Sequence, residues 1–178
     1  MGKKGPVILI GFSILLLIFM AWVSTLPDII ALENQVVFSS ESNTGNKVQS
    51  ALSSAENWKT RLFLNPDSKV RFMPLKDGFK WFSDEEGDGA LALSQKENDT
   101  ISYQLITDNG QFRNRGVYFF DYSNGETTLT WRDTLDVSTS FFARLSAKEE
   151  KFKVRISDKN QRDLEQVIKE VLTANVKP

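Results

Sequence analysis

Residues 7–26 form an uninterrupted apolar run that contains no charged side chain. A helix of about 20 such residues rises about 30 Å, which matches the hydrocarbon thickness of a lipid bilayer. Lys3 and Lys4 stand directly before the run, and Asp28 and Glu33 follow it. No other part of the chain is comparably apolar. The sequence therefore predicts one membrane-spanning helix that carries one folded domain.

The flanking charges predict the orientation of this helix. Because basic residues stay on the cytoplasmic side of a membrane, the N-terminus is expected inside the cell. We therefore expect residues 1–27 to be a single-pass anchor in the inner (cytoplasmic) membrane and residues 28–178 to be a domain on the periplasmic, extracytoplasmic side. The alternative is a cleaved secretory signal, which has a shorter apolar stretch of about 7–15 residues and an A-x-A-like site. Residues 21–24 match such a site poorly.

The composition excludes several classes of function. The chain has no cysteine and no histidine, which rules out disulfides, thiol nucleophiles, Ser-His-Asp catalysis and cysteine-based metal centres. We expect no metal and no cofactor. The 178 residues include 22 basic and 23 acidic side chains. This balance argues against a nucleic-acid partner, which requires a basic face.

Periodicity within the domain predicts a strand, a helix and then several strands. Residues 34–41 are rich in β-prone side chains. A helix that ends near Trp58 is indicated by apolar residues at the spacing of one helix face, Val48, Ala51, Leu52 and Ala55. Alternating or β-prone segments joined by short turns predict an antiparallel meander at 79–83, 89–95, 100–107, 116–122 and 127–137. Asn124-Gly125 is a strong hairpin signal between the last two segments.

The end of the domain predicts a long amphipathic helix, since apolar residues recur at i, i+3, i+4, i+7 and i+8 as Leu164, Val167, Ile168, Val171 and Leu172. Residues 138–156 are ambiguous: 141–145 fits a short helix, whereas 151–156 fits a last strand with alternating apolar residues. A sheet with one apolar face and an amphipathic helix each need a partner. We therefore expect an α+β fold in which a curved antiparallel sheet wraps around the C-terminal helix.

Three segments of the domain have a recognisable order and spacing. Lys47–Trp58 is a helix that ends in Trp, Gly87–Leu93 leads into the strand Ile101–Leu105, and Gly125–Trp131 is a strand that ends in Trp. Together with the C-terminal helix they resemble the polyketide cyclase / START-like (SRPBCC) superfamily, which has a helix-grip fold. Several members also carry one N-terminal membrane helix, so the chain resembles a membrane-anchored member.

The resemblance implies a cavity between the curved sheet and the C-terminal helix, where members bind lipids, sterols, polyketides or other apolar molecules. By this analogy the domain binds an apolar or amphipathic, lipid-like small molecule near the membrane. Two alternatives stay open. One is an envelope interaction module that has a closed pocket and binds a protein partner. The other is a cyclase- or dehydratase-type enzyme, for which Asp133 with Tyr103 is the one acid–base pair to test.

The candidate ligand contacts are three aromatic residues and one carboxylate, Trp81, Tyr103, Trp131 and Asp133. Apolar pockets with a few polar anchors are typical of ligand sites, but large aromatics also dominate ordinary cores. A carboxylate buried beside Trp131 needs a partner, which is expected to be a ligand or one of Arg113 and Arg115. The alternative is that Asp133 lies at a solvent-exposed strand end. No catalytic residue is assigned.

Overall fold

The structure, a computed structural model, describes residues 4–39, 43–62, 69–85, 87–96 and 99–174. Its helices are α1 (Lys4–Ser24), α2 (Thr44–Ser53), α3 (Ala55–Leu62), α4 (Phe141–Ala147) and α5 (Glu150–Ala174). Its strands are β1 (Ile29–Ser39), β2 (Arg71–Leu75), β3 (Gly78–Phe82), β4 (Gly89–Lys96), β5 (Thr100–Thr107), β6 (Phe112–Ser123) and β7 (Glu126–Asp136). A short 3-10 turn at Asp108–Gly110 joins β5 to β6.

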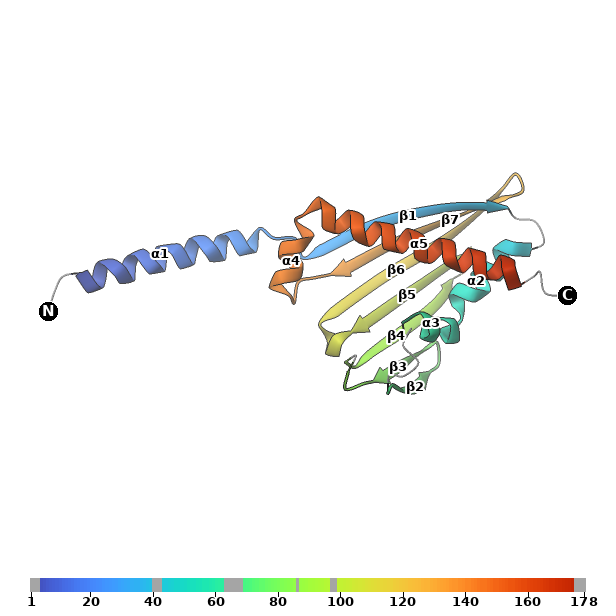
Figure 1. Cartoon of the computed structure of the whole chain (residues 1–178), viewed down its shortest axis with the longest axis horizontal. Coiled ribbons are helices and arrows are strands. Elements are labelled where there is room, and N and C mark those ends of the chain that lie inside the picture. The colour runs from blue at the N-terminus through green and yellow to red at the C-terminus, as the bar shows by residue number, and fades with distance from the viewer. Residues whose placement is uncertain (1–3, 40–42, 63–68, 86, 97–98, 175–178) are drawn as a thin grey trace.

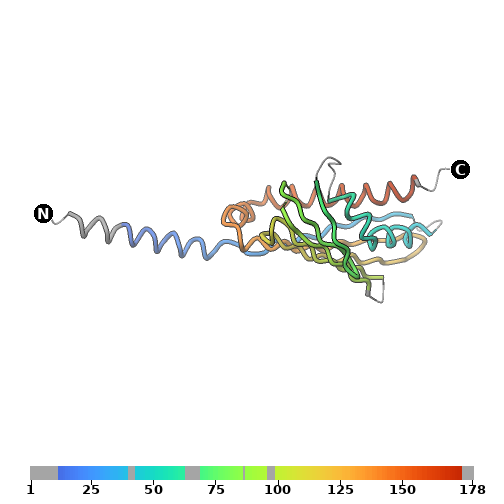
Figure 2. Tube along the Cα trace, turned by 90° about the horizontal axis from the view of Figure 1, so that it is seen from below, coloured from blue at the N-terminus to red at the C-terminus, as the bar shows by residue number. Residues whose placement is uncertain are grey.

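The described strands form one antiparallel sheet in the order β1-β7-β6-β5-β4-β3-β2. Strands β2 to β7 follow one another as a meander, and β1 closes the far edge beside β7 (Figure 1). Helices α2, α3 and α5 lie over the same face of the sheet (Figure 2). The predicted α+β architecture, with an antiparallel sheet covered by a long C-terminal helix, is therefore confirmed.

The predicted hairpin between β6 and β7 is also present. Asn124 and Gly125 both have positive φ, 51° and 79°, as the tight turns that match the twist of two antiparallel strands require. The strand predicted at 34–41 begins earlier, at Ile29, and its residues 40–41 lie outside the described residues. Strand β2 was not predicted, because its segment has no alternating pattern and contains Pro74.

The first helix of the domain differs from its prediction. The segment that ends near Trp58 is two helices, because Ser54 has an extended backbone (φ −81°, ψ 115°) between them. The break changes the direction of the chain, and the Trp58 indole nitrogen donates to the carbonyl of Leu52 at 2.9 Å. Trp58 is thereby buried against the core.

The prediction of a last strand at 151–156 is wrong, because α5 already begins at Glu150. Phe152 and Ile156 are four residues apart, so they lie on one face of a helix. They pack against a small buried cluster that contains Ile30 and Val137. Val154, which lies between them in the sequence, is exposed. All three residues fit the period of a strand, but only Phe152 and Ile156 fit one face of a helix, and their packing against the cluster around Ile30 selects the helix.

The main core fills the space between the sheet and helices α2, α3 and α5. The sheet contributes alternate residues of β3 to β7, and α5 contributes Leu164, Val167 and Ile168. At 25 residues, α5 is about 37 Å long, so it runs along most of the sheet. This layer of side chains encloses the site described below.

Helix α1 projects away from the rest of the molecule (Figure 1). Its side chains are described from Phe12 onward, and the large apolar ones from Phe12 to Met20 are exposed, with exposed fractions of 48% to 68%. Among the described residues, no helix meets the combined requirements of length and apolarity for crossing a membrane.

Candidate ligand cavity

A cavity of about 220 Å³ lies between the sheet and α5, where the resemblance placed one. Leu52 of α2 and three residues of α3 form one wall, and α5 forms the other. Tyr118 of β6 and Trp131 of β7 form the floor. The α5 residues Asp163 and Glu170 line the cavity and are also solvent-exposed. The cavity therefore opens to solvent between α3 and α5.

The base of the cavity is an aromatic cluster. Tyr118 and Trp131 face each other across neighbouring strands, with ring centroids 5.3 Å apart. Tyr103 of β5 lies against both, at 5.8 and 6.5 Å, and Trp58 packs on Tyr103 at 4.9 Å. Such contacts hold each ring in one orientation and add about 0.5–1.5 kcal/mol per pair beyond burial. The cavity floor is therefore a firm apolar surface.

A row of three residues across three strands supports this floor. Tyr103 of β5 pairs with Gly116 of β6, and Gly116 pairs with Asp133 of β7. Neighbouring strands lie about 4.8 Å apart, so Tyr103 and Asp133 are separated by a whole strand. The Tyr103 ring crosses over Gly116, and its hydroxyl donates to Asp133 Oδ1 at 2.7 Å. Only glycine at position 116 leaves room for this crossing.

Asp133 is buried, with 5% of its surface exposed. Burial raises the pKa of the Asp133 carboxyl, and the hydrogen bond from Tyr103, together with the nearby backbone of Thr134 and the side chain of Asn160, counteracts part of this rise. Burial also raises the pKa of the Tyr103 hydroxyl well above 10, and the neighbouring Asp133 raises it further. Tyr103 therefore keeps its proton at neutral pH and acts as a fixed donor.

The Tyr103 hydroxyl also accepts a hydrogen bond from the Trp131 indole nitrogen at 3.2 Å. Trp131 thus donates to Tyr103, which donates to Asp133. Trp131 lines the cavity, whereas Tyr103 and Asp133 lie behind it. The buried pair holds the Trp131 ring on the cavity floor.

Among the charged residues that line the cavity, Arg61 is partly buried, whereas Lys159, Asp163 and Glu170 are exposed. Burial lowers the pKa of the Arg61 guanidinium, while Tyr118, Glu170 and Asp163 raise it. Among the described residues, no carboxylate lies within 4 Å of the Arg61 guanidinium. The side chain is therefore positioned to donate hydrogen bonds into the cavity, next to the Tyr118 ring.

The structure brings three of the four predicted site residues together. Trp131 lines the cavity, and Tyr103 and Asp133 form the pair behind it. Trp81 does not belong to this group: it lies on β3, where it packs on Phe79 and its ring covers Gly89.

The expected pairing of Asp133 with Arg113 or Arg115 is wrong, and so is the alternative of a solvent-exposed strand end. Strand register places Arg113 opposite Asp136 and Arg115 opposite Thr134. Both arginines are exposed on the other face of the sheet, since successive residues of a strand point to opposite faces. Asp133 is on the buried face, and its partner is Tyr103.

Sequence reasoning missed Gly116, Tyr118 and Arg61. Gly116 had a readable signal, because a glycine inside a strongly β-prone run often marks a close approach of another group. Tyr118 lies two residues further on the same face. Arg61 had no such signal, since its segment follows the break at Ser54 and lacks a clear apolar period.

Solved structures with a similar fold cover more than four-fifths of the chain. The protein TTHA0849 from Thermus thermophilus has a TM-score of 0.56 at 13% identity, over 83% of this chain and 100% of that one. A conserved protein from Geobacillus kaustophilus has a TM-score of 0.54 at 12% identity, over 82% and 97%. Norcoclaurine synthase from Thalictrum flavum, in complex with dopamine and hydroxybenzaldehyde, has a TM-score of 0.52 at 11% identity, over 84% and 89%.

At these identities the likeness concerns the fold alone. These neighbours share the architecture of the domain, an antiparallel sheet with a long C-terminal helix, so the helix-grip fold expected from the resemblance is confirmed. No family model matches the sequence, and no curated protein matches it.

Proposed function

We propose that the domain binds a small amphipathic molecule in the cavity between the sheet and α5. The observation that carries this proposal is a cavity with an aromatic floor and an arginine in its wall. Ligand sites commonly combine a mostly apolar lining with a few placed polar groups. The helix-grip fold of the domain is compatible with such a cavity but does not identify the ligand.

The size of the cavity limits the ligand. Its volume of about 220 Å³ is below the ~300–1,000 Å³ of pockets that enclose drug-sized molecules. A ligand that fits inside has one ring or a short aliphatic chain. A two-chain lipid does not fit, so a lipid-like ligand is limited to a single short chain.

Arg61 defines the polar end of the ligand. A half-buried guanidinium without a close carboxylate favours a ligand atom that accepts hydrogen bonds, because the contact offsets the loss of hydration. The apolar end then rests on Trp131 and Tyr118. A short-chain carboxylate meets both conditions, and a neutral alcohol meets them less well. An amine is disfavoured beside Arg61, because the carboxylates that could pair with it, Asp163 and Glu170, lie on the solvent-exposed side of the cavity.

The proposal includes a location for the domain. Residues 7–26 are apolar and uncharged. The large apolar side chains of α1 from Phe12 to Met20 are exposed, and Phe19 and Trp22 also contact Phe141 of α4. We propose that α1 anchors the chain once in the inner membrane, with the N-terminus inside and the domain on the periplasmic side, because Lys3 and Lys4 precede the run. The anchor keeps the cavity close to membrane-derived ligands.

Binding can be measured through the tryptophans of the cavity. In a chain with Trp22→Phe and Trp81→Phe, the remaining tryptophans are Trp58 and Trp131, which both line the cavity. The chain is held in nanodiscs of a two-chain phospholipid, which does not fit the cavity. Titration with octanoate, octanol and octylamine is expected to change this fluorescence in that order of affinity. A matched change with octylamine, or no change with any of the three, would contradict the proposal.

Two variants separate the polar and apolar parts of the site. Arg61→Gln is expected to weaken octanoate binding about tenfold, which corresponds to ~1.4 kcal/mol, and to affect octanol less. Val167→Phe fills the cavity from α5 and is expected to weaken both ligands. Arg113→Gln, which removes an exposed arginine on the opposite face, is the matched control and should leave both affinities unchanged. An equal effect of Arg61→Gln and Arg113→Gln would exclude the cavity as the binding site.

The geometry of the Tyr103–Asp133 pair does not support a role as the acid–base pair of an enzyme. The two residues satisfy each other at 2.7 Å, and they lie behind Trp131 rather than in the lining of the cavity. Absence of ligand binding by the intact cavity would instead favour the interaction module.

A further inference from the structure

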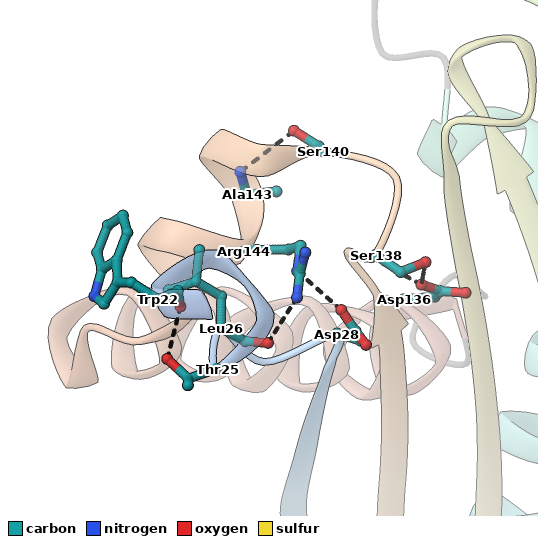
Figure 3. Close-up of polar contacts among 9 residues, drawn as sticks. All are labelled: Trp22, Thr25, Leu26, Asp28, Asp136, Ser138, Ser140, Ala143 and Arg144. Carbon is teal, nitrogen blue, oxygen red and sulfur yellow. Dashed lines mark hydrogen bonds and ion pairs between the residues drawn. The ribbon is translucent and has the colours of Figure 1, made fainter. Parts of the chain in front are cut away.

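An arginine of α4 contacts the junction between α1 and the domain. Arg144 of α4 donates from Nη2 to the carbonyl of Leu26 at 3.0 Å, and its Nε forms an ion pair with Asp28 Oδ1 at 2.8 Å (Figure 3). Leu26 itself is buried, with 3% of its surface exposed. The chain that leaves α1 is therefore fixed against α4, which limits free rotation of the domain about the helix.

The end of α1 and the start of α4 share an aromatic surface. The ring of Phe141 lies 6.0 Å from that of Phe19 and 6.5 Å from that of Trp22. Phe142 continues the surface, 5.5 Å from Phe141, and 77% of its own surface is exposed. It is the most exposed of the large apolar side chains described outside α1. The apolar surface of α1 thus extends onto a short helix of the domain.

A basic side chain contacts this surface, and the segment that carries it is rich in basic residues. The Lys148 ammonium lies 6.0 Å from the Trp22 ring. Residues 141–159, which cover α4 and the start of α5, include six basic and three acidic residues, although the chain as a whole has a net charge of −1. Aromatic rings with adjacent lysines and arginines are typical of protein surfaces at the headgroup level of a bilayer. Anionic lipid headgroups attract such a basic segment.

We propose that α4 is a second membrane contact, with Phe142 inserted among the lipid headgroups and Lys148 next to lipid phosphates. This inference rests on the proposed anchoring by α1. Two contacts, joined by the Arg144 clamp, fix the tilt of the domain on the bilayer. The cavity residues of α5, from Lys159 to Glu170, begin about 14 Å along the helix from its first residue. The cavity is then held close to the lipid surface but outside the bilayer.

The absence of cysteine from the chain allows a direct test. Single cysteines at position 142, at position 16 in α1 and at position 123 can each carry an environment-sensitive nitrobenzoxadiazole label without a competing thiol. Ser123 is exposed at the β6–β7 hairpin. This hairpin lies at the opposite end of the sheet from Ile29, where β1 begins after α1. The full chain is reconstituted in vesicles of phosphatidylcholine and phosphatidylglycerol, with and without doxyl-labelled lipid as quencher.

The expected result is that doxyl lipid quenches the labels at positions 16 and 142, and that the label at position 123 stays in water. Quenching of the label at position 16 but not of the label at position 142 would contradict the second membrane contact and would still support anchoring by α1. No quenching at either position would overturn the anchor and, with it, the inference. Iodide in the buffer serves as the aqueous quencher. A label at position 142 that neither iodide nor doxyl lipid quenches would show that protein, and not lipid, covers this position, which would also contradict the second contact.

Discussion

Replacement of Gly116 by alanine tests the central feature of the site. Gly116 lies under the Tyr103 ring, and a Cβ at this position would come within 2.5 Å of the Tyr103 hydroxyl oxygen and closer still to two ring carbons. The tyrosine must move away, because the Cβ is fixed by the sheet. Its hydrogen bond to Asp133, and the one it accepts from Trp131, are then lost.

The cost can be worked out from these contacts. Overpacking of a buried site costs ~1–3 kcal/mol, and loss of a hydrogen bond to a buried charged group adds ~1.5–3 kcal/mol. The higher strand propensity of alanine offsets ~0.5–1 kcal/mol. We expect Gly116→Ala to lower the free energy of unfolding by ~3 kcal/mol, or to lower Tm by about 6–12 °C for a domain of this size.

The assay is urea unfolding of the full chain in detergent, in two backgrounds. With Tyr103 present, Gly116→Ala is expected to show the full loss. In a Tyr103→Leu background the ring is absent, so the same glycine replacement should be neutral or stabilising by up to ~1 kcal/mol. An equal loss in both backgrounds would refute the reasoning, because the cost would then not come from the crossing of Tyr103 over Gly116.

Three further predictions concern single residues. Burial raises the pKa of Asp133. The stability that the protonated carboxyl contributes is therefore present below the ordinary aspartate pKa of about 3.9 and is lost as the pH rises through the folded-state pKa. In urea unfolding, the stability of Asp133→Asn relative to wild type should increase from about pH 4 to pH 8. Leu52→Ala, at a fully buried position in the cavity wall, should cost ~2–5 kcal/mol, and it should improve binding of decanol relative to octanol in the fluorescence titration. Arg144→Gln should lower stability by only about 1 kcal/mol, because its partner Asp28 is largely exposed, and should speed proteolysis between residues 24 and 29; unchanged cleavage there would contradict the clamp.

The regular parts of the fold were predictable because their signals are local. Strands β4, β5 and β7 have alternating apolar residues, and α5 has a clear helical period from Leu164 onward. The β6–β7 turn follows from Asn124-Gly125, since only a few residues accept positive φ readily. The prediction of a strand for Phe152–Ile156 is wrong because the spacing of Phe152 and Ile156 fits both a helix and a strand. Only the contacts with β1 decide between the two.

The candidate site depended more strongly on distant contacts. Asp133 and Tyr103 were identified from the sequence as a pair, but the sequence did not place the pair behind Trp131. Arg61 reaches the cavity because the chain breaks at Ser54, and Trp81 is excluded because it lies on β3, far along the sheet from β7. The positions of Tyr103, Asp133 and Trp81 depend on the order and register of strands that are far apart in the sequence, and the position of Arg61 depends on how α3 packs after the break.

The sequence by itself therefore determined the apolar segment of residues 7–26, the order of most strands and the amphipathic C-terminal helix. Each of these follows from the period or composition of neighbouring residues, which fixes what a segment must bury. The tertiary structure decided the row Tyr103–Gly116–Asp133, the cavity above it and the clamp between Arg144 and the end of α1. These features arise where segments far apart in the chain meet, and the space left between their side chains depends on strand register and helix placement, which no local pattern contains.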